Sequence, residues 1–288
     1  MSILFPATMN ITLLSALIFM GAVAAGFLGS LTGLGGGVVL VPLLTLGFGV
    51  DIRYAMGASL VSVIATSSGA AAAYVREGYS NVRIGMFLEV ATSSGALMGA
   101  AAAMHVSSGA LAIIFGLVLF WSAIGAPGTD PTCRSALPPS DKSLGSLLRL
   151  NGSYPAGGTE CFYEARNVTL GFLLMAGAGA LSGMLGIGSG AVKVLAMDRA
   201  MRLPFKVSTT TSNFMIGVTA AASAGIFLSR GYIDPGIVMP VMLGVLTGAL
   251  AGSKLLMKAP ARAMRLVFRG VLLVLGVEMI WNAVGKRL

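Results

Sequence analysis

The feature that most limits the fold is a succession of ten apolar segments with short polar or basic stretches between them. The segments occupy residues 8–31, 36–49, 54–75, 82–103, 108–125, 166–185, 190–201, 206–229, 235–256 and 262–285. Only 10% of the residues are charged, whereas a soluble domain carries about 25%. A water-soluble core could not bury this much apolar surface, so we expect an all-α polytopic membrane protein.

Two of the ten segments, 36–49 and 190–201, are too short to cross a bilayer, which takes about 20 residues. Each follows a glycine-rich break, GLGGG at 33–37 and GIGSG at 186–190. Whether these short segments cross the membrane or re-enter it is left open.

The two breaks lie 153 residues apart, and the same offset aligns other residues of the two halves. It pairs Ser59 with Ser212 and Thr66 with Thr219, for example. We therefore predict two pseudo-symmetric repeats of about five segments, residues 1–126 and 166–288, separated by a polar insert, 127–165. An odd number of crossings in each repeat would make the repeats inverted, whereas re-entrant short segments would make them parallel, and we prefer the inverted arrangement.

The insert is predicted to be a β-hairpin outside the bilayer, with SLLRLNGSY and CFYEARNV as strands around the turn PAGGTE. Its Cys133, together with Cys161, matches no metal or redox spacing, and a disulfide between them is left open. The basic residues of the loop between the last two segments place that loop, and with it the insert, on the cytoplasmic side. Both termini would then lie outside a bacterial or archaeal plasma membrane.

The two breaks are the candidate binding site. Backbone inside a bilayer is left unpaired only where protein or a watery cavity surrounds it. Glycines let a ligand approach the free N–H groups closely, and such groups favour a small anion. Scattered glycines such as Gly95, Gly99, Gly248 and Gly252 are instead interpreted as helix-packing residues.

The stretches GFLGSLTGLGGGVVLVPLL, YAMGASL, LSGMLGIGSGAVKV and TTTSNFMIGVTAAASAGIFLSRGYIDP resemble the sulfite exporter TauE/SafE family. The resemblance covers nearly the whole chain. It implies a multi-pass permease for sulfite, sulfonates or related organic anions, whereas the spacing alone indicates only a small anion. Ser189 departs from the first break, which carries glycine at the matching position.

The predicted substrate-binding residues come from both repeats. They are Gly33, Gly35, Gly36, Gly37, Ser59, Gly186, Gly188, Ser189, Gly190, Lys193, Thr210, Thr211, Ser212 and Asn213. Lys193 is expected either to contact the anion or to extend toward the membrane surface. Ser208 and Thr209 are assigned to helix capping.

Glu89 lies inside the fourth segment and has two interpretations. It could exchange a proton during transport, because burial disfavours a charged carboxylate. It could instead be paired with Arg83 or another base, and we prefer this interpretation.

We expect a secondary transporter that exports a small anion such as sulfite or a sulfonate. An anion channel and an uptake permease for small carboxylates are the alternatives. A single histidine and the lack of a nucleophile motif argue against an enzyme, and no cofactor, metal or nucleic acid is expected. The expected partners are the anion and the lipid bilayer. The identity of the anion, the coupling ion and the oligomeric state are not determined by the sequence.

Overall fold

The computed structural model describes residues 11–30, 36–76, 80–124, 144–156, 159–188, 190–256 and 261–285. Its long helices are α1 (Ile11–Ser30), α3 (Ile52–Arg76), α4 (Val82–Ala103), α5 (Ser108–Ile124), α7 (Val168–Leu185), α9 (Phe205–Ser229), α10 (Pro235–Leu256) and α11 (Ala261–Val284). The short elements are α2 (Gly37–Pro42), α6 (Leu144–Leu147), α8 (Gly190–Leu195) and the strands β1 (Gly152–Ala156) and β2 (Thr159–Tyr163). The all-α membrane class is therefore confirmed, and the hairpin is a small addition to it.

The predicted short segments are short in the structure as well. Both α2 and α8 have six residues, and each continues into a π-helical turn, Leu43–Gly47 or Ala196–Ala200. In the first case Pro42 closes α2, and a proline lacks the N–H that the regular helical ladder needs. By contrast, five helices in the described part of the chain are long and apolar enough to span a membrane: Thr12–Gly29, Val82–Ala103, Val168–Leu185, Val207–Ser229 and Pro235–Gly252.

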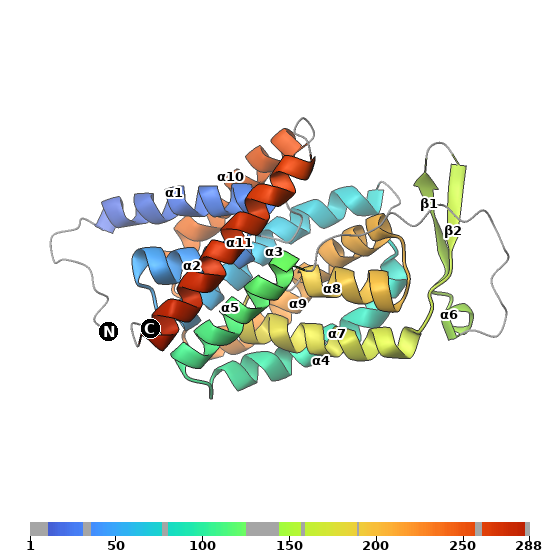
Figure 1. Ribbon diagram of the computed structural model, residues 1–288, viewed down its shortest axis with the longest axis horizontal. Coiled ribbons are helices and arrows are strands. Elements are labelled where there is room, and N and C mark those ends of the chain that lie inside the picture. Colours follow the sequence, from blue (N-terminus) through green and yellow to red (C-terminus); the bar gives the residue numbers. More distant parts are fainter. Residues whose placement is uncertain are drawn as a thin grey trace.

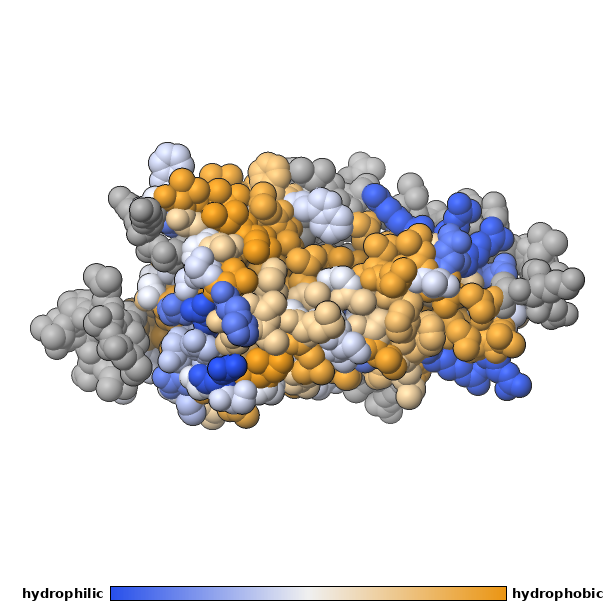
Figure 2. All heavy atoms as spheres, turned by 90° about the horizontal axis from the view of Figure 1, so that it is seen from below, coloured by the Kyte–Doolittle hydropathy of each residue, from blue (hydrophilic) through white to orange (hydrophobic). Residues whose placement is uncertain are grey.

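The surface has the pattern that a bilayer requires. In Figure 2 apolar residues cover the middle of the visible face, and hydrophilic residues gather toward the two ends. Large apolar side chains of the helices, such as Met98, Leu173 and Trp281, are more than half exposed. Lipid chains would solvate these side chains, so their exposure costs little in a membrane.

Helix pairs from opposite halves of the chain pack closely through glycine. A β-carbon built on Gly99 of α4 would lie 1.9 Å from the carbonyl oxygen of Ala180 in α7. One built on Gly248 of α10 would lie 2.1 Å from that of Val23 in α1. Only glycine allows such approach, so the packing interpretation of Gly99 and Gly248 is supported. Both pairs lie side by side in Figure 1.

The second long helix of each half, α3 or α9, runs antiparallel to its counterpart. Gly57 near the start of α3 lies against Tyr232 just beyond α9, whereas Ser67 lies against Gly217 in the middle of α9. Inverted repeats would have this direction. The superposition of the two halves and the three-part division of the chain stay predictions.

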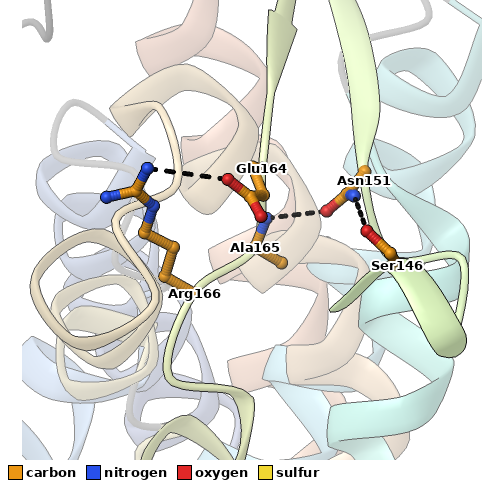
Figure 3. A network of polar contacts seen from close by, with 5 residues as sticks. All are labelled: Ser146, Asn151, Glu164, Ala165 and Arg166. Atoms are coloured by element: carbon orange, nitrogen blue, oxygen red, sulfur yellow. Dashed lines mark hydrogen bonds and ion pairs between the residues drawn. The ribbon is translucent and has the colours of Figure 1, made fainter. Parts of the chain in front are cut away.

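The insert differs partly from its expected form. β1 and β2 pair antiparallel, as an expected hairpin would, with Gly152 opposite Tyr163. The turn is tighter than expected, because β1 extends to Ala156 and β2 begins at Thr159, and the second strand ends at Tyr163 rather than continuing through residues 164–168. However, the first part of the expected strand is the short helix α6 followed by a turn, where Arg149 adopts a positive φ of 52°. Asn151 holds this turn, because its side chain bonds Ser146 Oγ at 3.0 Å and Ala165 N at 3.0 Å (Figure 3).

The insert is fastened to the helices rather than standing free. Leu150 and Ala165 are buried in an apolar core shared with α4, α7 and α9. The amide of Asn81, just before α4, donates to Leu150 O at 3.1 Å and to Tyr163 Oη at 2.8 Å. Cys161 is disulfide-bonded, and the other cysteine of the sequence, Cys133, lies outside the described residues.

Candidate functional site

The two glycine-rich breaks touch each other through Ser59 of α3. A β-carbon on Gly37 would lie 2.5 Å from Ser59 Oγ and 3.5 Å from the Cα of Ile187. Ser59 Oγ in turn donates a hydrogen bond of 2.7 Å to Gly186 O. Ser59 is completely buried and Ile187 nearly so. The hydrogen bond between Ser59 and Gly186, which are 127 positions apart in the sequence, thus connects the end of the first break to the second break.

The backbone conformation of the second break requires glycine at two positions. α7 ends at Gly186, which has φ 67° and bonds back to Ser182 O, and Gly188 has φ 70°. L side chains rarely adopt this left-handed region, so glycine is the default residue here. Gly188 also lies tightly between helices, because its β-carbon would meet Ile216 at 2.9 Å and Val63 at 3.2 Å.

Lys193 of α8 is the charged group nearest to the second break in sequence, and its side chain is completely buried. Its Nζ donates to Thr219 Oγ1 of α9 at 2.6 Å. Burial excludes the alternative in which Lys193 extends to the membrane surface. The cation is instead held inside the protein by a neutral hydroxyl.

Thr219 connects Lys193 to Glu89 of α4. Its Oγ1 lies 2.7 Å from Glu89 Oε1 and 2.9 Å from the carbonyl oxygen of Met215, so its single proton is shared between these two acceptors. Ser93 Oγ donates to the same carboxylate oxygen at 2.7 Å. We call Lys193, Thr219 and Glu89 the buried relay. It joins α8, α9 and α4 by side-chain contacts.

The relay balances charge at membrane depth. An isolated ionised side chain is costly to bury, whereas a cation and an anion bridged by one hydroxyl leave no net charge. Glu89 is 9% exposed, and its Oε2 atom is buried without a hydrogen-bond partner among the described residues. The expected pairing with Arg83 or another base thus takes the form of an indirect link to Lys193.

The remaining predicted residues of α9 do not all face this region. Ser212 Oγ donates to Gly190 O at 3.3 Å, beside the second break. Thr210 bonds Val207 O of its own helix, Thr211 Oγ1 accepts from Asn81 N at 3.1 Å, and Asn213 is half-buried. Successive residues of a helix point about 100° apart, so four in a row cannot line one site.

The capping assignment is wrong. α9 begins at Phe205 with Pro204 as the residue before it, and no side chain in the described part of the chain caps this end. Ser208 and Thr209 therefore lie inside the helix. Proline suits a helix start because its φ is fixed near the helical value. The helix therefore begins directly after Pro204, upstream of the hydroxyl residues that were expected to cap it.

Some predicted residues lie outside the described part of the chain, namely Gly33, Gly35 and Ser189. Gly36 is described and buried, and its carbonyl oxygen accepts from Leu40 N at 3.0 Å at the start of α2.

Sequence reasoning missed two buried hydroxyl residues. Thr219 carried a signal, since it aligns with Thr66 across the repeats and lies seven residues after Ser212 on one helix face. Ser182 lies one turn before Gly186, is completely buried, and has no hydrogen-bond partner for its Oγ in the described part of the chain. Nothing distinguished Ser182 in the sequence, because serine in an apolar helix ordinarily bonds a carbonyl of its own helix.

Comparison with known proteins agrees with this architecture. The family model described as "Sulfite exporter TauE/SafE" matches residues 18–279. The chain belongs to the sulfite exporter TauE/SafE family. No solved structure matches it.

Members of the TauE/SafE family among the curated proteins align over most of their length. "Probable membrane transporter protein YunE" of Bacillus subtilis is 24% identical over 93% of this chain and 97% of its own. "Probable membrane transporter protein YdhB" of the same organism is 27% identical over 84% of this chain and 89% of its own. A "Probable membrane transporter protein" of Xylella fastidiosa is 24% identical over 90% and 92%. The chain is accordingly a multi-pass membrane protein of a transporter family.

Proposed function

We propose that the protein is a secondary transporter that exports a small anion such as sulfite or a sulfonate. The observation that carries this proposal is the contact of the two breaks at Ser59, next to helices that hold a completely buried lysine. The family description names sulfite export, and the curated relatives are named membrane transporters. Fold and relatives alone would support only the coarser statement of a membrane transporter.

The anion is proposed to bind where the breaks meet, with backbone N–H groups, Ser59 and Ser212 around it. Lys193 supplies the positive charge, and the unpartnered hydroxyl of Ser182 is a further donor. Oxyanions suit such a site because their several oxygens accept hydrogen bonds from neutral donors. A site with one compensated cation also binds weakly enough to release its ligand.

Counterflow in proteoliposomes tests this function. Vesicles loaded with one unlabelled anion are diluted into the same labelled anion, and the panel contains sulfite, methanesulfonate, sulfoacetate, taurine, thiosulfate and acetate. We expect transient, saturable accumulation of labelled sulfite or of a sulfonate. Conductive flux without counterflow would indicate a channel, and accumulation of acetate alone would indicate a carboxylate permease. If no member of the panel exchanges, the proposed function is wrong.

A pair of glycine variants tests the position of the site. A side chain at Gly36 would meet Val245 at 3.0 Å, whereas a β-carbon at Gly47, at the end of the same segment, meets no described residue within 4 Å. We expect Gly36→Val to abolish exchange in a folded protein and Gly47→Val to retain it. Equal exchange by both variants would mean that the first break is not part of the site. Gly188→Val is less informative, because the positive φ of Gly188 would itself be strained.

A further inference from the structure

We propose that the buried relay takes up one proton for each anion bound, so that the protein co-transports an anion and a proton. This inference rests on the proposed anion transport. It assigns Glu89 as the proton acceptor and Thr219 as the residue that couples Glu89 to Lys193.

The contacts of the relay leave one site for the proton. Glu89 Oε1 already accepts from Ser93 Oγ and lies 2.7 Å from Thr219 Oγ1. Glu89 Oε2 is buried and has no hydrogen-bond partner among the described residues. Oε2 is therefore the carboxylate oxygen that a proton can reach without breaking an existing hydrogen bond.

Few other charged groups are near the relay. Apart from Glu89, α4 carries Arg83, six residues away, and α7 carries no charged residue. On α9 the charged residue is Lys206, thirteen residues before Thr219, which corresponds to about 20 Å along a helix. Asp198 and Arg199 follow Lys193 by more than one turn. On α3, which also packs against α9, the charged residues are Arg53 and Arg76, at the two ends of that helix. Among the described residues, Lys193 and Glu89 therefore set the charge of this region between them.

Binding of an anion changes that balance. In the empty protein one ammonium faces one carboxylate across the Thr219 hydroxyl. An anion that approaches Lys193 puts two negative charges beside one positive charge, and like charges so close favour protonation of one of them. A proton from water then binds Glu89 Oε2 and converts the carboxylate into a neutral acid, while Lys193 pairs with the substrate. On release of the anion Glu89 returns the proton to water and pairs with Lys193 again.

This scheme has a defined charge balance. A monoanion that moves with one proton carries no net charge across the membrane, and a dianion carries one negative charge. The direction of net flux then follows the sum of the anion and proton gradients, so export of a monoanion requires an outward anion gradient that exceeds the inward proton gradient. For a monoanion the flux does not respond to the membrane potential.

The test uses proteoliposomes that contain a trapped pH-sensitive dye, with labelled methanesulfonate as the probe. Methanesulfonate remains a monoanion at neutral and mildly acidic pH, so any accompanying proton must be carried by the protein. When the outside is more acidic than the vesicle interior, we expect the inward proton gradient to drive accumulation of methanesulfonate inside the vesicles. We also expect that inward flux of methanesulfonate at equal pH acidifies the vesicle interior. Glu89→Gln should exchange methanesulfonate at equal pH but neither accumulate it in a pH gradient nor move protons.

Thr219→Val keeps the shape of the side chain but removes the hydroxyl that links the two charged groups. Gradient-driven accumulation should fall about tenfold or more, in line with the loss of a hydrogen bond to a charged group, and Thr219→Ser should restore it. Thr66→Val is the matched control, since Thr66 aligns with Thr219 in the first half and its hydroxyl bonds Ser62 O and Val63 O of its own helix. This control should remain coupled to protons.

The outcomes separate this inference from the proposed function. Methanesulfonate exchange without proton movement, or proton movement that persists in Glu89→Gln, overturns the relay while transport stands. If methanesulfonate does not exchange but another anion of the panel does, infrared difference spectra between the free protein and the protein with that anion bound test whether Glu89 takes up a proton. A carboxylic-acid C=O band that disappears in Glu89→Gln supports the relay, and its absence from the native protein overturns it. If no anion exchanges, the transport proposal itself fails.

Discussion

At the scale of single residues, Ser59 is the side chain that ties one half of the chain to the other at the breaks. Its hydroxyl reaches Gly186 O in the second half, whereas Ser62, one turn further along α3, bonds Ala58 O of its own helix at 2.9 Å. Both serines are completely buried. They form a matched pair that differs only in the acceptor of the hydrogen bond.

Ser59→Ala is expected to lower the free energy of unfolding by about 1–3 kcal/mol, because it leaves the buried carbonyl of Gly186 without this donor. Ser62→Ala should cost less than about 1 kcal/mol, since Ala58 O belongs to a helical ladder. Thermal unfolding of the two purified variants in one detergent measures the difference. Equal losses of stability would show that the bond between the halves contributes nothing beyond an ordinary buried hydroxyl.

Residue-scale prediction succeeded where a residue was unusual for its surroundings. Lys193 and Glu89 were identified because ionisable groups are rare at membrane depth. Their connection through Thr219 was not, because it depends on how α4, α8 and α9 pack. Thr210 and Thr211 were assigned to the binding site in one group with Ser212, and this assignment was too broad. A run of hydroxyl residues in the sequence does not lie on one face of a helix.

At the scale of elements, segment positions were the most predictable property. The expected segment 82–103 coincides with α4, and 235–256 coincides with α10. Apolar length fixes these bounds. The hairpin was predicted less well, because the mixed leucine and polar sequence of residues 146–150 suits a strand locally, whereas the helix α6 and the turn around Asn151 depend on long-range contacts.

The glycine contact between α4 and α7 gives an element-scale prediction. Gly99→Ala would place a β-carbon 1.9 Å from Ala180 O, whereas a β-carbon at Gly225 of α9 has no neighbour within 4 Å in the part of the chain that the structure describes. We expect Gly99→Ala to destabilise the protein by about 1–3 kcal/mol through overpacking. Gly225→Ala should be neutral or slightly stabilising, because alanine favours a helix over glycine. Denaturation in a mixed detergent series measures both, and unchanged stability of Gly99→Ala would mean that α4 and α7 separate easily.

At the scale of the whole molecule, two observations disagree about which end faces the cytoplasm. The hairpin lies at one end of the molecule and α11 finishes at the other (Figure 1). Basic residues concentrate toward the hairpin end, among them Arg83, Arg149, Arg166 and Arg202, and this favours a cytoplasmic hairpin. The disulfide-bonded Cys161 favours an oxidising compartment for the same end. We propose the cytoplasmic placement, with both termini outside the plasma membrane.

Single cysteines in a chain whose native cysteines are replaced by serine test this orientation. Leu147 of α6 is 78% exposed, and Ser107, in the turn between α4 and α5, is exposed as well. With a membrane-impermeant maleimide on intact cells, Ser107→Cys should be labelled and Leu147→Cys should react only after the cells are opened. The reverse pattern would place the hairpin outside and agree with the disulfide.

The pairing of α1 with α10 has a consequence for biosynthesis. α1 ends at Ser30, whereas α10 begins at Pro235, so the partner that fills the close contact at Gly248 is synthesised late. At about 5–20 residues per second, roughly 10–40 s pass between the two helices. During that interval α1 must stay in the bilayer on its own hydrophobicity, with its contact surface covered by lipid or by the insertion machinery. The first half of the chain therefore cannot reach its final packing until nearly all of the second half has been translated.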